Sequence, residues 1–163
     1  MKSQLASRAL AGALVLALSA PAFAALGDNA ASVLTDQARM KGTLRSVDNH
    51  TYVMHEITGS SGAKVREYVS PAGLVFGIAW EGQFPPNLQD LLGPYYQQAQ
   101  QAEAQKKAAD EQSEQRVPRR RGGAAVVETP GLVFVQAGHP RSFHGMAYVP
   151  QLIPQGMLPG DIR

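Results

Sequence analysis

Cysteine does not occur in this chain of 163 residues. Its absence excludes disulfide bonds, catalysis by a thiol and lipidation of an N-terminal cysteine. An exported protein can do without disulfide bonds when it is long enough to bury a hydrophobic core of its own. We therefore expect one domain whose fold rests on apolar packing.

Long apolar runs are scarce, and one stands near the N-terminus. Ala9–Ala20 follows the basic residues Lys2 and Arg8 and precedes Ala22-Phe23-Ala24, a small-x-small cleavage pattern. The run is shorter than the roughly 20 apolar residues of a membrane-spanning helix. It predicts a signal peptide, residues 1–24, cleaved after Ala24, with an uncleaved anchor as the alternative. We therefore expect a periplasmic or secreted protein, without a transmembrane helix in its mature chain.

Neither charge is in excess once this leader is removed. The chain has 15 basic and 13 acidic residues, and Lys2 and Arg8 are the only charged residues of the leader. The predicted mature chain, residues 25–163, therefore carries 13 of each sign and is close to neutral. This balance speaks against binding to nucleic acid, which needs clustered positive charge.

Motifs for catalysis, metal binding and phosphate binding are missing as well. The HEITG stretch at His55 lacks the second histidine of a zinc-protease motif and lies in a strand pattern rather than a helix. The turn Gly59–Gly62 (GSSG) lies between two expected strands, whereas the nucleophile elbow of a hydrolase joins a strand to a helix. We predict no cofactor, no metal site and no catalytic residue. Whether the protein is an enzyme is left uncertain, and the residues favour a non-enzymatic role.

Alternation of apolar and polar residues is the main structural signal that is present. Thr51–Thr58 and Lys64–Val69 alternate on either side of the Gly59–Gly62 turn, which predicts a β-hairpin. The apolar run Leu74–Trp80 then predicts the third strand of a meander. Its side chains are expected on two faces, with Leu74, Phe76, Ile78 and Trp80 on one face and Val75, Gly77 and Ala79 on the other.

Two helical segments are expected. Asp28 predicts the start of a short helix that reaches Met40, with an ordered arm as the alternative. Asn87 predicts the cap of a helix that follows the third strand. Residues 97–123 are rich in Gln and Ala and end in a basic linker. They predict an insertion that is either helical or disordered, because no apolar stripe runs along it.

The C-terminal part returns to a strand pattern. Ala124–Thr129, Leu132–Ala137 and Phe143–Val149 are expected strands, and a proline-rich tail follows them. The fold class predicted is α+β: a mainly antiparallel sheet of about five or six strands, built from a meander and the C-terminal strands. One helix follows the third strand, and the tail packs along the domain.

Several residues suggest a binding surface. Glu67 lies between Val65 and Val69 and needs a partner such as Arg45 or Arg141 if its face of the sheet is buried. Gly77 and Ala79 are small enough to leave room for a ligand. The candidate interaction surface consists of aromatic side chains and one histidine: Tyr52, Tyr68, Trp80, His144 and Tyr148.

Five stretches carry a resemblance to a known family. They are ALG at 25–27, MKGTL at 40–44, HEITGSSGAKVREYVSPAGLVFGIAWEG at 55–82, PPNLQDLLGPYY at 85–96 and GHPRSFHGMAYVPQLIPQGM at 138–157. Together they resemble the exported family of Gram-negative bacteria called domain of unknown function 2844. The resemblance covers nearly all the mature chain except the Gln-rich insertion. It implies a cleaved signal and an envelope location, and it implies no activity and no catalytic residues.

Three functions stay open at this point. The first is a non-enzymatic accessory protein that binds an envelope or periplasmic protein partner. The second is an envelope hydrolase built from scattered Ser, His and Asp residues, which predicts that His55 or His144 contacts a carboxylate. The third is a carrier of a small apolar ligand held over Gly77 and Ala79.

Overall fold

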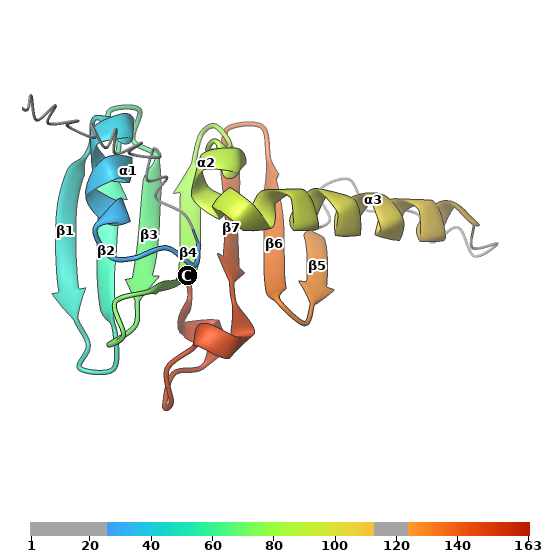
Figure 1. Cartoon of the computed structure of the whole chain (residues 1–163). Helices are drawn as coiled ribbons and strands as arrows, with labels where there is room; N and C mark the ends of the chain where they lie inside the picture. Colours follow the sequence, from blue (N-terminus) through green and yellow to red (C-terminus); the bar gives the residue numbers. More distant parts are fainter. Residues whose placement is uncertain (1–25, 113–123) are drawn as a thin grey trace, which may run out of the picture.

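Seven antiparallel strands form one sheet in the order β1-β2-β3-β4-β7-β6-β5 (Figure 1). The computed structural model that shows them describes residues 26–112 and 124–163. Two meanders, β1 to β4 and β5 to β7, join where β4 pairs with β7. The predicted signal peptide, residues 1–24, lies outside the described residues, as do residues 113–123 of the predicted insertion.

The elements have the following bounds. The strands are β1 (Thr43–Asp48), β2 (Val53–Thr58), β3 (Lys64–Val69), β4 (Val75–Gly82), β5 (Ala125–Thr129), β6 (Leu132–His139) and β7 (Ser142–Tyr148). The helices are α1 (Ser32–Met40), α2 (Leu88–Leu92) and α3 (Tyr96–Gln112), with 3-10 turns η1 (Gly93–Tyr95), η2 (Pro150–Leu152) and η3 (Pro159–Asp161). None of the helices in the described ranges is long and apolar enough to span a membrane.

The predicted α+β class with a mainly antiparallel sheet is confirmed, and two of its details are wrong. The sheet has seven strands instead of five or six, and the helix expected after the third strand follows the fourth. Both errors come from β1. This edge strand is mostly exposed along its length, so it lacks the apolar alternation that marks a half-buried strand.

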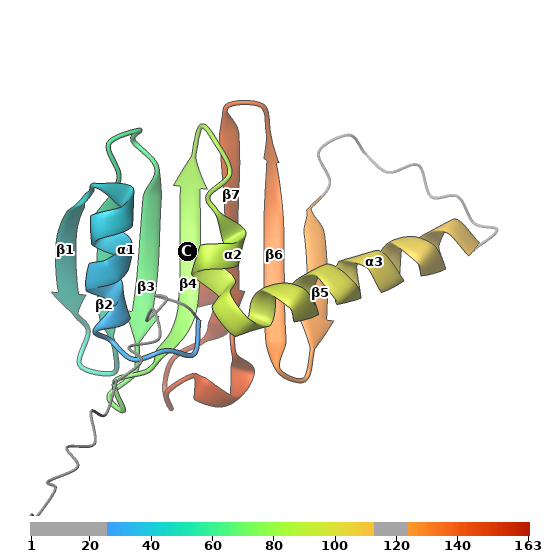
Figure 2. The same cartoon turned by 45° about the horizontal axis from the view of Figure 1, so that its top comes forward.

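The two faces of the sheet are covered by different parts of the chain. Helices α1 and α2 and the start of α3 lie over one face, the helical face (Figures 1 and 2). The segment after β7 packs on the opposite face, the tail face. The helical-face core includes Leu26, Val33, Ile57, Val65, Ile78, Trp80, Leu92 and Phe134. The tail-face core consists of Tyr68, Phe76, Ala79, Met157 and Ile162.

A β-bulge at Phe76 changes the expected sides of β4. Tyr68 pairs with Gly77 and Val69 pairs with Val75, so Phe76 has no opposite residue on β3. Phe76 therefore joins the tail-face core, whereas Ile78 and Trp80 belong to the helical-face core. The predictions that Phe76 shares a face with Ile78 and Trp80, and Val75 with Gly77 and Ala79, are both wrong, because strict alternation ends where the extra residue enters the strand.

The C-terminal tail fills the space that was expected over Gly77 and Ala79. A Cβ atom placed on Gly77 would come within 2.9 Å of Ile162 Cδ1. Ile162 is 2% exposed, and Ala79 and Met157 are buried beside it. The prediction of room for a ligand at this place is therefore wrong, because the chain supplies its own apolar cover.

Helices α2 and α3 follow β4 in close succession. Asn87 caps α2 as predicted, because its side chain accepts a hydrogen bond from the backbone nitrogen of Gln89. The first turns of α3 dock through the buried Ala99 and through Gln98 Nε2, which donates to Thr129 Oγ1 at 2.7 Å. Further along, α3 extends past β5 at the sheet edge (Figures 1 and 2). The segment predicted as an insertion is thus helical up to Gln112.

Candidate functional site

The five residues of the predicted interaction surface do not form one surface. Trp80 is 3% exposed on the helical face, where its ring centroid lies 5.9 Å from that of Phe134. Tyr68 is also 3% exposed but belongs to the opposite face. Tyr52 and Tyr148 are half-buried against the tail-face core, and His144 is exposed. The structure therefore separates Trp80 from the other four by the thickness of the sheet.

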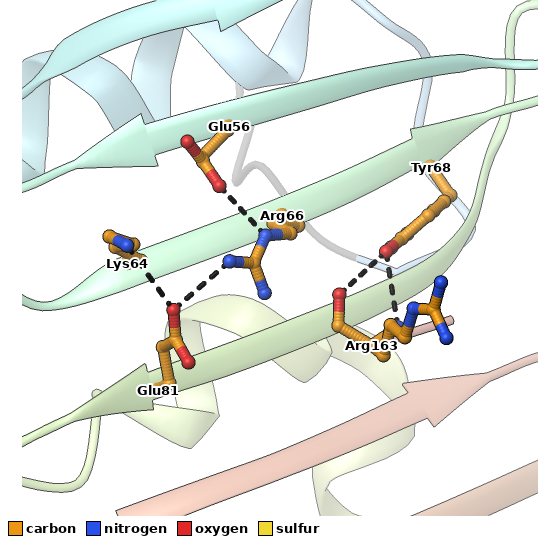
Figure 3. A network of polar contacts seen from close by, with 6 residues as sticks. All are labelled: Glu56, Lys64, Arg66, Tyr68, Glu81 and Arg163. Atoms are coloured by element: carbon orange, nitrogen blue, oxygen red, sulfur yellow. Dashed lines mark hydrogen bonds and ion pairs between the residues drawn. The ribbon is translucent and has the colours of Figure 1, made fainter. Parts of the chain in front are cut away.

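Tyr68 serves as an internal anchor for the tail. Its hydroxyl donates a hydrogen bond to the Arg163 carbonyl oxygen at 2.9 Å and accepts one from the Arg163 backbone nitrogen at 3.1 Å (Figure 3). Its ring lies 5.7 Å from the ring of Tyr52 and 6.2 Å from that of Phe76. Both the hydroxyl group and the ring of Tyr68 thus make contacts within the fold.

An ion-pair network lies beside this anchor on the same face of the sheet. Arg66 Nε donates to Glu56 at 2.8 Å, Arg66 Nη2 donates to Glu81 at 3.0 Å, and Lys64 Nζ lies 3.5 Å from Glu81 (Figure 3). Arg66 and Lys64 lower the pKa of Glu81 against the opposing effect of partial burial. Since Glu56, Lys64, Arg66 and Glu81 are paired with one another, the network links the three neighbouring strands β2, β3 and β4.

Glu67 has a different environment from the one that its sequence neighbours suggested. It is 1% exposed, and it lies on the helical face with His55 and Ile78 as its neighbours on adjacent strands. The expected arginine partner is not there, because Arg45 is opposite Glu56 and points to the other face. Glu67 instead interacts with the carboxyl group of Asp36 on α1. The prediction of an Arg45 or Arg141 partner is wrong.

Both carboxyl groups favour the protonated state. Burial, followed by the negative charge of Asp36, raises the pKa of Glu67 to about 9. Burial raises the pKa of Asp36 to about 7, although Glu67 and Arg39 oppose the rise. At neutral pH the two groups therefore hold at least one proton between them. The shared proton forms a hydrogen bond between the two carboxyl groups, whose buried oxygens Asp36 Oδ2 and Glu67 Oε1 and Oε2 have no other hydrogen-bond partner in the described part of the chain.

His55 extends the row of polar residues across the helical face. Ser46 on β1, His55 on β2 and Glu67 on β3 are opposite one another on adjacent strands. Ser46 Oγ and His55 Nδ1 lie 2.7 Å apart. Burial lowers the pKa of His55, which favours its neutral form. For the described residues, no ion pair within 4.0 Å joins His55 or His144 to a carboxylate, so the contact expected of a hydrolase is not seen.

A cavity of about 200 Å³ opens next to the acid pair. Asp36, Arg39 and Met40 of α1 form one side, and Trp80 and Glu81 of β4 form another. The β2–β3 turn, the Phe84–Asn87 connection and α2 complete the wall, which is mainly apolar. Phe84 is 67% exposed at this site. We refer to this space as the Phe84 cavity.

Sequence reasoning missed the central residue of this site. The valines around Glu67 marked it as a buried carboxylate, but nothing around Asp36 in the sequence distinguished it from an ordinary polar residue of a surface helix. Its role depends on how α1 lies across the sheet. Among residues 26–112 and 124–163 no group of three or more His, Cys, Asp or Glu side chains could hold a metal ion.

Comparison with known proteins identifies the family and goes no further. A family model described as "Protein of unknown function (DUF2844)" matches residues 22–162. This confirms the family predicted from the sequence stretches. No curated protein and no solved structure matches the chain. The arrangement of the site is therefore the basis for any statement about function.

Proposed function

The chain belongs to the family of proteins of unknown function 2844. We propose from its N-terminal sequence that it is an exported protein of the bacterial envelope, and from its geometry that it acts by binding. The Phe84 cavity is its binding site, and a protein partner in the envelope or periplasm is its target. Binding takes place without a chemical reaction.

The observation that best supports this proposal is an exposed aromatic side chain beside a concave, mainly apolar site. Among the described residues, the large hydrophobic side chains that are exposed are those of Leu34, Phe84 and Leu158, and Phe84 is the aromatic one. Interfaces are enriched in aromatic anchors that enter pockets on the partner, and in pockets that receive such anchors. A cavity of about 200 Å³ is also smaller than the roughly 300–1,000 Å³ of typical small-molecule sites, so it suits a single side chain or a similarly small group.

The acid pair is poorly placed for catalysis. A carboxyl group with a pKa near neutrality can act as a general acid or base when it reaches the reacting atoms. Glu67 is buried behind Asp36 and does not line the cavity, so only Asp36 faces a molecule bound there. This arrangement supports recognition more than proton transfer.

Site-specific crosslinking in intact cells tests the binding site. We expect a photo-crosslinking residue at position 84 to capture one envelope protein, because position 84 lies at the cavity. The matched control carries the same residue at position 144, which is exposed on the opposite face and belonged to the predicted surface. Capture at 144 and not at 84 would move the site to the tail face and refute the proposal.

Export is tested by the N-terminus of the protein in the cell. The basic start, the apolar run and the cleavage pattern before Ala25 support a signal peptide. Leu26 is fully buried, and its backbone nitrogen donates to the Leu91 carbonyl oxygen at 3.0 Å. We expect mass spectrometry to find a chain that begins at Ala25 in the envelope or secreted fraction. A chain that keeps residues 1–24 in the cytoplasm would contradict export.

A hydrolase is a second candidate because of one contact. The 2.7 Å contact between Ser46 Oγ and His55 Nδ1 pairs a hydroxyl with a neutral imidazole, as in activated nucleophiles. If this pair is catalytic, Ser46→Ala and His55→Ala should each abolish the cellular function in a folded protein. Under the binding proposal both variants keep that function, and Phe84→Ala loses it.

A further inference from the structure

Helix α1 is held on the sheet by few side chains. It has nine residues, and those that are buried are Ser32, Val33 and Asp36. Ser32 Oγ donates to a backbone carbonyl oxygen three residues earlier at 2.6 Å, so its hydrogen bond does not reach the sheet. Leu34 is 60% exposed. The apolar part of the hold therefore comes from Val33 and the partly buried Met40, and Asp36 supplies the polar part.

Both ends of α1 are fixed independently of these side chains. Before the helix, the backbone nitrogen of Ala30 donates to the Gly73 carbonyl oxygen at 2.8 Å, and Asn29 forms an isolated bridge with Leu74. After the helix, Lys41 adopts a left-handed conformation with φ 47°, and the chain then enters β1. The segment between these points is a short unit that can open while its ends stay in place.

The contact of Asp36 with Glu67 joins this unit to β3. Asp36 is 3% exposed and Glu67 is 1% exposed, so water does not screen one carboxyl group from the other. A hydrogen bond between two carboxyl groups needs a proton on one of them, and two carboxylates in contact repel each other. The contact therefore attracts while the pair holds a proton and repels once that proton is lost.

The surrounding charges do not replace the proton. The charged and titratable groups that face the pair and the neighbouring cavity are Arg39 from α1, His55 from β2, Lys64 from β3, Glu81 from β4 and Asp90 from α2. Arg39 Nη1 lies 3.9 Å from Asp36 and 3.8 Å from Asp90, and Lys64 Nζ lies 3.5 Å from Glu81. Arg39 therefore favours a first ionisation of the pair, and the remaining proton keeps the two carboxyl groups together.

We propose that α1 is a proton-dependent latch, which stays on the sheet while Asp36 and Glu67 share a proton and opens when that proton is lost to solvent. The pKa values of about 7 and about 9, against ordinary values of 3.8 and 4.5, set the pH range. Between pH 7 and pH 9 the closed form binds one proton and the open form binds none. The equilibrium constant for opening therefore rises about tenfold per pH unit.

Opening of the latch changes the Phe84 cavity. Asp36, Arg39 and Met40 form one of its walls, and Val65 and Trp80 line it from the sheet. When α1 opens, the cavity loses the α1 wall and the apolar sheet residues become accessible. The latch thus controls the size of the cavity, and it operates whether or not a partner binds there.

Amide hydrogen exchange of the mature protein between pH 6 and pH 9, followed by NMR, measures opening. After correction for the intrinsic exchange rate, we expect the protection factors of residues 36–40 to fall at least tenfold from pH 7 to pH 8.5. They should lie below the protection factors of β3 and β4 at every pH, because α1 opens while the sheet stays folded. Equal protection in α1 and the strands would show global unfolding only and would overturn the latch.

A spin label gives a second, local measurement. The chain has no cysteine, so Leu34→Cys allows one label on α1. Leu158→Cys, at a tail position that is 69% exposed, is the matched control. We expect the mobile component of the spectrum to increase at position 34 from pH 6 to pH 9 and to stay constant at position 158. An equal increase at both positions would refute a local opening.

Variants separate the two parts of the hold. Glu67→Gln cannot ionise, so the protection of α1 should change less than threefold between pH 7 and pH 9. Asp48→Asn, at an exposed position, is the control and should keep the tenfold change per pH unit. Val33→Ala weakens the apolar part, so it should lower the protection of α1 by the same factor at every pH. This variant provides the comparison if Glu67→Gln folds poorly.

Protection of α1 that does not depend on pH in the wild type, or an unchanged pH dependence in Glu67→Gln, would each overturn the proposal. Crosslinking at position 84 is independent of these measurements. A captured partner together with an α1 that does not respond to pH would refute the latch and leave the binding function in place.

Discussion

Glu67 lies on β3 between Val65 and Val69, in apolar surroundings. The protein places a second carboxyl group, Asp36, against it instead of a positive charge. Burying an ionised carboxylate without a partner costs much free energy, so the pair retains protons. The raised pKa values result from burying two carboxyl groups side by side, and they make the free energy of unfolding depend on pH.

The direction of that dependence follows from the two pKa values. The ordinary pKa values of Glu67 and Asp36 are 4.5 and 3.8, and folding raises them to about 9 and about 7. The folded protein therefore binds protons that the unfolded chain has already released. The stabilising contribution of the pair is complete below pH 4 and is lost as the pH rises through 7 and then 9.

We expect Glu67→Gln to flatten this dependence. The amide keeps the shape of the side chain and cannot ionise, so the free energy of unfolding should fall less between pH 5 and pH 8.5. The difference should be on the order of 3 kcal/mol. Urea denaturation at both pH values measures it, with Asp48→Asn as the exposed control. Parallel pH profiles in Glu67→Gln and the wild type would contradict the assignment.

At the scale of elements, the C-terminal tail acts as a packed segment without regular strands or long helices. Ile162 and Met157 enter the tail-face core, and the Tyr68 hydroxyl forms two hydrogen bonds with the Arg163 backbone. Apolar burial and hydrogen bonds thus hold the tail at the same place, next to Gly77. A Cβ atom at position 77 would lie 2.9 Å from Ile162 Cδ1, so a larger residue there would make the Ile162 side chain shift.

Tyr68→Phe should loosen the end of the tail without disturbing the sheet. The variant keeps the ring and removes both hydrogen bonds to Arg163, which are worth about 1 kcal/mol each. We expect faster amide hydrogen exchange at residues 161–163 and unchanged exchange in β3 and β4. Tyr52→Phe is the matched control, because its ring lies 5.7 Å away and its hydroxyl forms no hydrogen bond to a described residue. Equal exchange in both variants would show that apolar packing alone holds the tail.

At the scale of the whole molecule, the sheet separates two cores of different origin. Helices cover one face and contribute the larger core, and the tail covers the centre of the other face. The Phe84 cavity lies on the helical side, where α1, α2 and the end of β4 meet. The two sides are therefore expected to respond differently to changes in the tail.

Removal of residues 153–163 tests this division. The deletion uncovers Phe76 and Tyr68 and removes two buried side chains, Met157 and Ile162. Each contributes roughly 1.5–3 kcal/mol, so we expect a loss of roughly 3–6 kcal/mol in urea denaturation and increased binding of a hydrophobic dye. Leu158→Ser, at a position that is 69% exposed, is the control and should change little. Unchanged stability of the truncated protein would show that the tail is not part of the core.

Local features of the sequence determined several parts of this protein. Alternation and turn residues specified the β2–β3 hairpin, and Asn87 specified the start of α2, because these features depend on neighbouring residues only. The family also followed from short stretches of sequence. The odd position of Glu67 was visible, although its partner was not.

Tertiary structure alone decided what lies on either face of the sheet. Alternation gives two sets of side chains but does not say which set meets the helices, and the bulge at Phe76 exchanged Val75 and Phe76 between the two sets. The need for glycine at position 145 could not be predicted from the sequence either. A Cβ atom there would collide with the ring of Trp80, which lies opposite on the neighbouring strand β4. Asp36 and Glu67 meet because α1 packs on the sheet over β2, next to β3 (Figures 1 and 2). Such contacts join residues far apart in the chain, and their energy depends on burial that no local pattern encodes.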